Sequence, residues 1–435
     1  MNKISLYIKQ AWTMMRQDRL YSSIYITGTG LSIALTMTLF VILYVKFAPL
    51  YPEYKRDRTL IINAVSMTPK DTTSNNFWQS TPNYKLVEKL RELQNIDAVT
   101  GIVCEWNDEF HEASTRLFSS GVSPLFVDAD YWKVYDFEFL SGSPFTSTDF
   151  TAKTKVAVVS KSFAETLFKS TDVLENKFFL DGSEYKIVGV VKDVPSSMHQ
   201  HTTADLWLPA TCTSNFYAPG ENDYDLRGGV FIAMTAKSPN VIDDLQDEVD
   251  EMMRKHNQQD KVYNHKLLGP DIFWANGFRQ GEYLDEFDSL MTYGYILLAL
   301  LIIPALNLSG MISSKMNRRR NELGIRKTYG ATNRQLLTQI LWENLFHTFV
   351  GGIVGIILSY LILMSTSNWI ISLLSDGFIF SKDLLSSNLS VEMLFNWSIF
   401  GGVVALCFLL NFLSATIPAI ASLRHSIINS LNQKQ

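Results

Sequence analysis

Charged side chains are missing from four long stretches of this 435-residue sequence. The runs without Asp, Glu, Lys or Arg cover residues 20–45, 289–314, 344–375 and 393–423. Each run exceeds the roughly 20 residues that a helix needs to cross the hydrocarbon of a bilayer. Because no Asp, Glu, Lys or Arg lies inside a run, the sequence shows no built-in proton relay or ion site of the usual kind. The sequence predicts four transmembrane helices and argues against a secondary transporter.

Cysteine and histidine are too scarce to suggest a metal site. The 3 cysteines are Cys104, Cys212 and Cys407, and no spacing among them resembles a zinc site. A Cys104–Cys212 disulfide is compatible with an exported domain, but the sequence leaves that pairing open. His199 and His201 form a close pair without an indicated third ligand. No hydrolase or metalloprotease motif is present, so we expect no metal and no catalytic site on this chain.

Lysine and arginine gather on one side of the predicted membrane helices. They are frequent in residues 1–19 and 315–343, whereas the connection 367–394 contains only Lys382. Basic loops stay in the cytoplasm, so both termini and the segment 315–343 are expected inside. The first helix is then an uncleaved signal anchor. Residues 48–288 are expected outside, and their excess of acidic residues argues against nucleic acid as a partner.

The exported region shows the alternation of strands and helices typical of an α+β domain. Asp181-Gly182 lies between two strand-like runs and predicts a hairpin turn. Helices are expected at 81–92, with Thr81 as N-cap, at 241–255 and at 271–290. Strand–helix–strand patterns on both sides of a β-rich middle suggest a subdomain inserted at about 123–226.

The predicted fold class is a membrane protein with four transmembrane helices and a large α+β domain inserted between the first and second. In chain order we expect a cytoplasmic amphipathic helix (1–19), the first transmembrane helix (20–47), the exported domain (48–288), the second transmembrane helix (289–314), a cytoplasmic segment (315–343), the third transmembrane helix (344–366), a short outside connection (367–394), the fourth transmembrane helix (395–423) and a cytoplasmic tail (424–435).

The densest positive charge lies in residues 315–343, which we call the basic segment. Gly330-Ala331 breaks its helical pattern, and Thr332 with Gln335 forms a capping box that opens a second helix. Glu322 and Arg326 are four residues apart, a spacing that allows an ion pair within one helix. A short loop would suffice to fix topology, so we expect a helix–turn–helix lever that points into the cytoplasm.

Small residues repeat along two of the predicted membrane helices. They recur every four residues in the first and third helices, at Gly28, Ser32 and Thr36 and at Gly351 and Gly355. Such faces let helices approach closely. We expect packing within the chain or across a dimer.

The basic segment closely resembles the cytoplasmic signature of FtsX-like permeases of MacB-type ABC transporters. The pattern falls on Arg319, Arg320, Glu322, Leu323, Gly324, Ile325, Arg326, Lys327, Gly330 and Ala331. The stretches DYWKVYDFEFLSGSPF, VAVVSKSFAETLF and YKIVGVVKDVPSSMHQH are similar to the MacB-like periplasmic core, and SATIPAIASLRHSIINSL to the family's C-terminal end.

This resemblance implies a non-catalytic permease subunit in the bacterial inner membrane, with its large domain in the periplasm. It implies that Arg319, Arg320, Glu322, Gly324, Arg326, Lys327, Gly330 and Ala331 couple the permease to a cytoplasmic ATPase. No Gly-x-x-x-x-Gly-Lys-Ser/Thr loop occurs in the sequence. A separate ATPase chain is therefore implied, which would hold the ATP and Mg²⁺.

The implied activity is mechanotransmission, in which ATP hydrolysis below the membrane moves the periplasmic domain to drive export. The implied partners are a second permease subunit, identical or paralogous, and a periplasmic adaptor with an outer-membrane channel. Two alternatives remain open: an FtsX-like regulator of a cell-wall hydrolase, and a permease for lipoprotein release.

Overall fold

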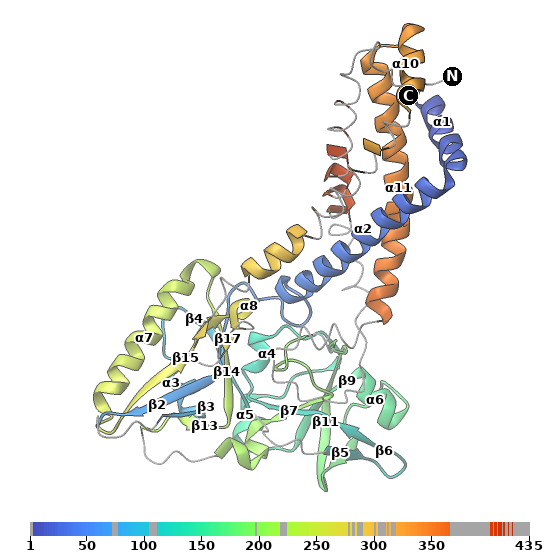
Figure 1. The fold of residues 1–435 in the computed structure, drawn as a ribbon. Helices are drawn as coiled ribbons and strands as arrows, with labels where there is room; N and C mark the ends of the chain where they lie inside the picture. The colour runs from blue at the N-terminus through green and yellow to red at the C-terminus, as the bar shows by residue number, and fades with distance from the viewer. Residues whose placement is uncertain are drawn as a thin grey trace. The chain divides into compact units, whose positions relative to one another are not determined.

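The computed structural model describes residues 3–71, 77–103, 111–195, 198–217, 224–276 and 319–365, with shorter pieces between 279 and 314 and between 401 and 420. The chain divides into two compact units (Figure 1). The first unit comprises Met1–Tyr44, Phe287–Ile370 and Val391–Gln435. The second unit comprises Val45–Glu286 and Ile371–Ser390.

The described part of the first unit is helical. Its helices are α1 (Lys3–Gln17), α2 (Arg19–Phe47), α10 (Arg320–Thr328) and α11 (Asn333–Ser365), with a shorter apolar helix at Leu290–Ala299. Among the described residues, α2 and α11 are the two helices long and apolar enough to cross a membrane. The predicted helices at 289–314 and 395–423 fall largely outside the described residues, so the count of four stays a prediction.

The second unit is built on β-sheets with helices packed against them. In the described residues, one sheet has twelve strands in the order β16-β1-β14-β4-β7-β12-β9-β11-β10-β5-β6, with β8 beside β11. A smaller sheet has the order β13-β3-β2-β15, and β17 pairs with β18. The strands are β1 (Thr59–Ile62), β2 (Ala64–Pro69), β3 (Trp78–Pro82), β4 (Ile96–Val103), β5 (His111–Ser114), β6 (Ser119–Val122), β7 (Pro124–Val127), β8 (Phe139–Gly142), β9 (Val156–Ser160), β10 (Lys177–Leu180), β11 (Ser183–Val191), β12 (Leu206–Pro209), β13 (Arg227–Gly228), β14 (Val230–Ala236), β15 (Tyr263–Leu268), β16 (Asp271–Ile272), β17 (Arg279–Gln280) and β18 (Tyr283–Leu284).

The large sheet continues through the region in which we expected an inserted subdomain. Strand β4 pairs with β14 over most of its length and with β7 at its end, where Ile102 lies opposite Val127. Strand β7 then pairs in parallel with β12. The strands of 123–226 therefore extend the sheet that β1, β4 and β14 begin, and subdomain boundaries at those residues stay a prediction.

Local sequence signals account for the hairpin between β10 and β11. Asp181 and Gly182 have φ of +48° and +78°. Two consecutive residues in the left-handed region form the tight turn that suits the twist of an antiparallel pair. Phe178 and Leu180 of β10 are buried and alternate with more exposed neighbours, as expected for a strand with one face in the core.

Six α-helices of the second unit lie in the described residues: α3 (Tyr84–Leu90), α4 (Tyr131–Val134), α5 (Ser147–Thr151), α6 (Lys161–Phe168), α7 (Ile242–Gln259) and α8 (Phe273–Asn276). Helix α3 begins later than predicted. The Asn83 side chain accepts a hydrogen bond from the Leu86 amide and caps the helix, whereas Thr81 belongs to β3 and pairs with Gly228. The expected single helix at 271–290 was also wrong, because its described residues up to Leu284 are divided among β16, α8, β17 and β18.

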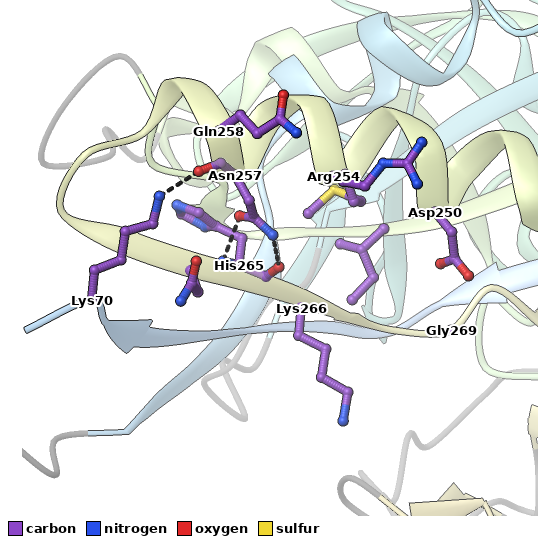
Figure 2. Close-up of a pocket in the computed structure, with 11 residues that line it drawn as sticks. Lys70, Asp250, Arg254, Asn257, Gln258, His265, Lys266 and Gly269 are labelled. Atoms are coloured by element: carbon purple, nitrogen blue, oxygen red, sulfur yellow. Dashed lines mark hydrogen bonds between the residues drawn. The ribbon is translucent and has the colours of Figure 1, made fainter. Parts of the chain in front are cut away.

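Helix α7 protects the outer edge of the smaller sheet. The Asn257 side chain donates to the His265 carbonyl and accepts from the His265 amide, both at 2.8 Å. Figure 2 shows this carboxamide between α7 and β15, beside a cleft of about 580 Å³ lined by Asp250, Arg254 and Lys266. The side chain thus replaces a neighbouring strand at this position of an otherwise open edge.

Candidate functional site

A tight turn joins α10 to α11 in the basic segment. The Gly330 amide donates to the Lys327 carbonyl, and the Ala331 amide donates to the Arg326 carbonyl, both at 3.0 Å. Gly330 has φ of +91°, which L side chains rarely adopt. This hydrogen-bond pair is the Schellman arrangement that ends a helix at a glycine. The turn therefore has a defined backbone geometry.

The next helix begins as the sequence predicts. The Thr332 amide donates to Gln335 Oε1 at 3.1 Å, and the Gln335 amide donates to Thr332 Oγ1 at 3.3 Å. These reciprocal bonds form the predicted capping box. With a glycine ending α10 and a capping box opening α11, neither helix end at the turn depends on water alone.

Ion pairs stiffen α10 and join it to α11. Glu322 Oε1 accepts from Arg326 at 2.6 Å, which is the predicted pair four residues apart. The same guanidinium donates to Gln339 Oε1 on α11 at 2.8 Å. Hydrogen bonding from Arg319, followed by its charge and that of Arg326, lowers the pKa of Glu322 below its ordinary value. The carboxylate is therefore held ionised between two arginines.

A buried carboxylate in α11 anchors the start of α10. Arg319 bonds to Glu343 at 2.9 Å and to Glu322 at 2.9 Å. Only 4% of Glu343 is exposed. The Arg319 guanidinium also lies 3.5 Å from the sulfur of Met14 in α1. Arg319 thus connects three helices of the first unit.

Polar contacts continue from Glu343 to α2. The His347 Nδ1–H donates to the Glu343 carbonyl at 2.8 Å, so its Nε2 accepts from the Ser22 hydroxyl at 3.1 Å. One turn further along α2, the Tyr25 hydroxyl lies 3.2 Å from Thr348 Oγ1. A chain of hydrogen bonds and ion pairs therefore links the turn of the basic segment to the α2–α11 pair.

Comparison with known proteins assigns both parts of the chain to families. Residues 22–252, more than half of the chain, match the MacB-like periplasmic core domain, and residues 294–427 match the FtsX-like permease C-terminal family. The chain belongs to the MacB-type, FtsX-like permeases. MacB-like and FtsX-like proteins are inner-membrane proteins with a periplasmic domain.

The relatives of this permease are distant in sequence. It is 23% identical to the uncharacterized ABC transporter permease YknZ of Bacillus subtilis over 62% of this chain and 64% of YknZ. It is 24% identical to the macrolide export ATP-binding/permease protein MacB of Haemophilus ducreyi over 57% of this chain and 34% of MacB. The chain thus spans less than two thirds of the length of either relative.

The chain is also similar to solved structures. The extracellular domain of YknZ from Gram-positive bacteria overlaps 48% of this chain and 100% of that domain, with a TM-score of 0.33 and 15% identity. The family assignment rests on the two family matches in sequence.

The tip of the basic segment exposes two large apolar side chains that are not among the predicted coupling residues. Ile325 is 51% exposed and Tyr329 is 88% exposed. They are four residues apart, which places Ile325 and Tyr329 on one side of the end of α10. Single exposed apolar side chains are common on protein surfaces, whereas adjacent ones can mark an interaction site. In the sequence, an isoleucine and a tyrosine four residues apart beside a basic turn are the signal that could have identified them.

The other predicted residues of the permease occupy different environments. Gly324 is buried, Arg326, Lys327 and Ala331 are half-buried, and Gly330 is exposed at the turn. The Arg320 side chain lies outside the described residues. Their roles in coupling stay predictions, whereas Glu343 and His347 enter the site only through the fold, because their partners are distant in sequence.

Glycines allow close contact between α2 and α11 of the permease. A Cβ atom added to Gly355 would lie 2.8 Å from the Gly30 carbonyl oxygen, and one added to Gly351 would lie 3.0 Å from Thr29 Cβ. Ser32 is half-buried and Thr36 is buried. Gly28 has nothing within 4 Å of an added Cβ. Its expected part in packing, within the chain or across a dimer, stays a prediction.

His199, His201, Cys104 and Cys212 are the residues of the second unit that bear on metal binding and disulfide formation. No group of three or more His, Cys, Asp or Glu side chains that could hold a metal ion lies within the described ranges. The rings of His199 and His201 lie with centroids 4.3 Å apart. Cys104 falls outside the described residues, so its pairing with Cys212 stays open.

Proposed function

We propose that this chain is the membrane subunit of an ATP-driven, MacB-type transporter that passes motion from a cytoplasmic ATPase to its periplasmic domain. The observation that carries the proposal is the fixed turn of the basic segment and its connection through Arg319 and Glu343 to α11. A turn held by a glycine cap, a capping box and ion pairs transmits force better than a flexible loop would.

The tip of that turn is the proposed contact with the ATPase. Tyr329 and Ile325 present apolar surface, and Arg326, Lys327 and Arg334 are close to them in the sequence. Interfaces gain most of their affinity from buried aromatic and arginine anchors, and a charged rim adds specificity. A partner pocket with apolar walls and an acidic rim fits this surface.

The remaining parts of the proposal follow from family membership and sequence. ATP and Mg²⁺ would bind to a separate ATPase chain, and the sequence itself has no phosphate-binding loop. Two permease copies, identical or paralogous, would act together, with both termini in the cytoplasm. A periplasmic adaptor and an outer-membrane channel would complete an export machine.

Purification of the tagged full-length chain in mild detergent, with identification of every co-purifying protein by mass spectrometry, tests this proposal. We expect an ABC ATPase together with an adaptor or an outer-membrane channel. An ATPase with a peptidoglycan hydrolase would instead support the regulatory function. A complex that survives extraction without any ATPase would overturn the proposed coupling.

A further inference from the structure

A buried ion pair holds the last turn of α2 within the second unit. Helix α2 is continuous from Arg19 to Phe47, and its residues from Val45 onward belong to the second unit. Arg56 is 5% exposed and Glu53 is 2% exposed. The Arg56 guanidinium donates to the Val45 carbonyl and to the Ala48 carbonyl, each at 2.7 Å.

The same arginine is fixed from its other side. Its Nε donates to Glu53 Oε2 at 2.8 Å, and its Nη2 donates to the same oxygen at 2.5 Å. Its Cζ lies 4.9 Å from the centroid of the Phe273 ring of α8. The guanidinium therefore touches the end of α2, a carboxylate and an aromatic ring at once.

Glu53 extends the contact to a third segment of the second unit. Its Oε1 accepts from the His199 amide at 3.0 Å and from the Thr202 hydroxyl. The Arg56 Nη2 also lies 3.4 Å from the sulfur of Met198. The pair thus joins the helix end to residues 198–202, which precede β12 of the large sheet.

The chemistry of this joint requires an arginine. The last carbonyls of a helix lack partners within the helix and carry its partial negative charge, so a cation with several donors satisfies both needs. Arginine offers five N–H donors in a planar fork, whereas lysine offers a single point charge. A buried charge without its partner would be costly, so Glu53 and Arg56 depend on one another.

We propose that Arg56 is a positioning residue that fixes the last turn of α2 to the second unit. A displacement of α2 is then passed through Glu53 to residues 198–202 and so to the large sheet. It is not lost through bending of the connecting residues 48–58. This inference rests on the proposed function for its consequence, because the movement of α2 would be driven by the ATPase. The joint itself stands on the contacts around Arg56.

Hydrogen–deuterium exchange of the full-length chain in lipid nanodiscs tests the joint without any partner. In Arg56→Gln, we expect the amides of residues 45–48 to exchange at least about tenfold faster, since hydrogen bonds to a charged group are lost. Arg58→Gln is the matched control. Arg58 bonds to the Ala236 carbonyl at 2.9 Å, to the Lys237 carbonyl at 3.1 Å and to Asp97 at 3.2 Å, and all three partners lie outside α2. Unchanged exchange in Arg56→Gln would overturn the proposal.

A second measurement, in the purified complex with its ATPase, tests the consequence. Trapping with ATP and vanadate should alter exchange at residues 198–202 of the wild-type chain. Arg56→Gln should lose this exchange response while its ATPase rate stays within about twofold of wild type. A misfolded variant would instead lose both the response and the ATPase rate. Arg58→Gln should keep both. A preserved response in Arg56→Gln, or loss of the response and the ATPase rate together, would overturn the positioning role.

If Arg56→Gln does not fold, Arg56→Lys keeps the charge but not the fork, and it should show a smaller loss of protection at residues 45–48. If the wild-type complex shows no response to ATP and vanadate, the proposed function fails. Faster exchange at residues 45–48 in the partner-free chain would still establish the joint in that case.

Discussion

Gly330 combines a left-handed backbone with open surroundings. Its φ is +91°, and nothing lies within 4 Å of an added Cβ. A β-branched side chain would therefore disturb the turn through backbone strain of about 1–2 kcal/mol rather than through a clash. We predict that Gly330→Val lowers the ATPase rate coupled to the permease, while expression and membrane insertion stay normal.

The matched control for Gly330→Val is Gly182→Val. Gly182, in the turn between β10 and β11, also has a positive φ of +78° and nothing within 4 Å of an added Cβ, so the same kind of backbone strain arises outside the basic segment. Measuring the yield of membrane-inserted protein and the ATPase rate of the complex separates the two variants. An equal loss of rate in both, or no loss in Gly330→Val, would contradict the role assigned to the turn.

At the residue scale, short-range chemistry could be predicted and long-range partners could not. The Glu322–Arg326 pair and the Thr332–Gln335 capping box depend on spacings of four and three residues, which the sequence displays directly. Glu343 differs, because its partner Arg319 is twenty-four residues away in the chain. A pairing at that separation is decided by how two helices pack.

At the scale of elements, a cluster of titratable groups joins α3, α7 and β15. Lys89 donates to His256 Nδ1 at 2.9 Å, and the Nε2–H of His256 donates to the Tyr224 carbonyl at 3.0 Å. His265 bonds to Asp260 at 2.9 Å, with its ring centroid 4.9 Å from that of His256. Burial, and then the charges of Lys89 and His265, lower the pKa of His256 from 6.5 to about 4.

This cluster predicts acid sensitivity of the contact between these elements. Because the pKa of His256 is lower in the folded than in the unfolded chain, its contribution to stability is present above about pH 6.5 and is lost as the pH falls toward 4. We expect the thermal midpoint of the full-length chain to fall over that range, and His256→Gln to fall less steeply. Parallel curves for wild type and His256→Gln would contradict this assignment.

Helices and strands with strong local sequence patterns were predicted well. Those whose ends depend on pairing with strands distant in the sequence were not. The β10–β11 hairpin and helix α7 carry clear turn and amphipathic patterns, and both formed near the expected residues. Thr81-Pro82 resembles a helix start, yet the pairing of β3 with β13 takes up those residues and moves the N-cap to Asn83. Tertiary pairing overrode a local preference there.

At the scale of the whole molecule, the charge distribution predicts which parts face the cytoplasm. Lys177 in β10 has a 64% exposed side chain, and Arg334 at the start of α11 is also exposed. In spheroplasts of cells carrying chains without native cysteine, a membrane-impermeant maleimide should label Lys177→Cys and spare Arg334→Cys. Both should react after permeabilisation. Labelling of Arg334→Cys in intact spheroplasts would reverse the predicted topology.

The family of the chain was predictable because the basic segment and the exported core both carry long motifs. The sequence also predicted the two helices, α2 and α11, that are long and apolar enough to span a membrane. The joint around Arg56 was not predictable, because it depends on residues 198–202 returning to the end of α2. Only the folded sheet brings those residues together.

The Asn257 side chain of α7, which bonds to the edge strand β15, affects how neighbouring copies in one membrane can associate. Copies of a membrane protein share a plane and an orientation, so their outward domains meet edge to edge far more often than they would in free solution. An open strand edge at that level invites pairing between neighbours and growth of a continuous sheet. The Asn257 side chain hydrogen-bonds to both the backbone amide and the backbone carbonyl of His265. Neither group is then available to a strand from a neighbouring copy in the membrane.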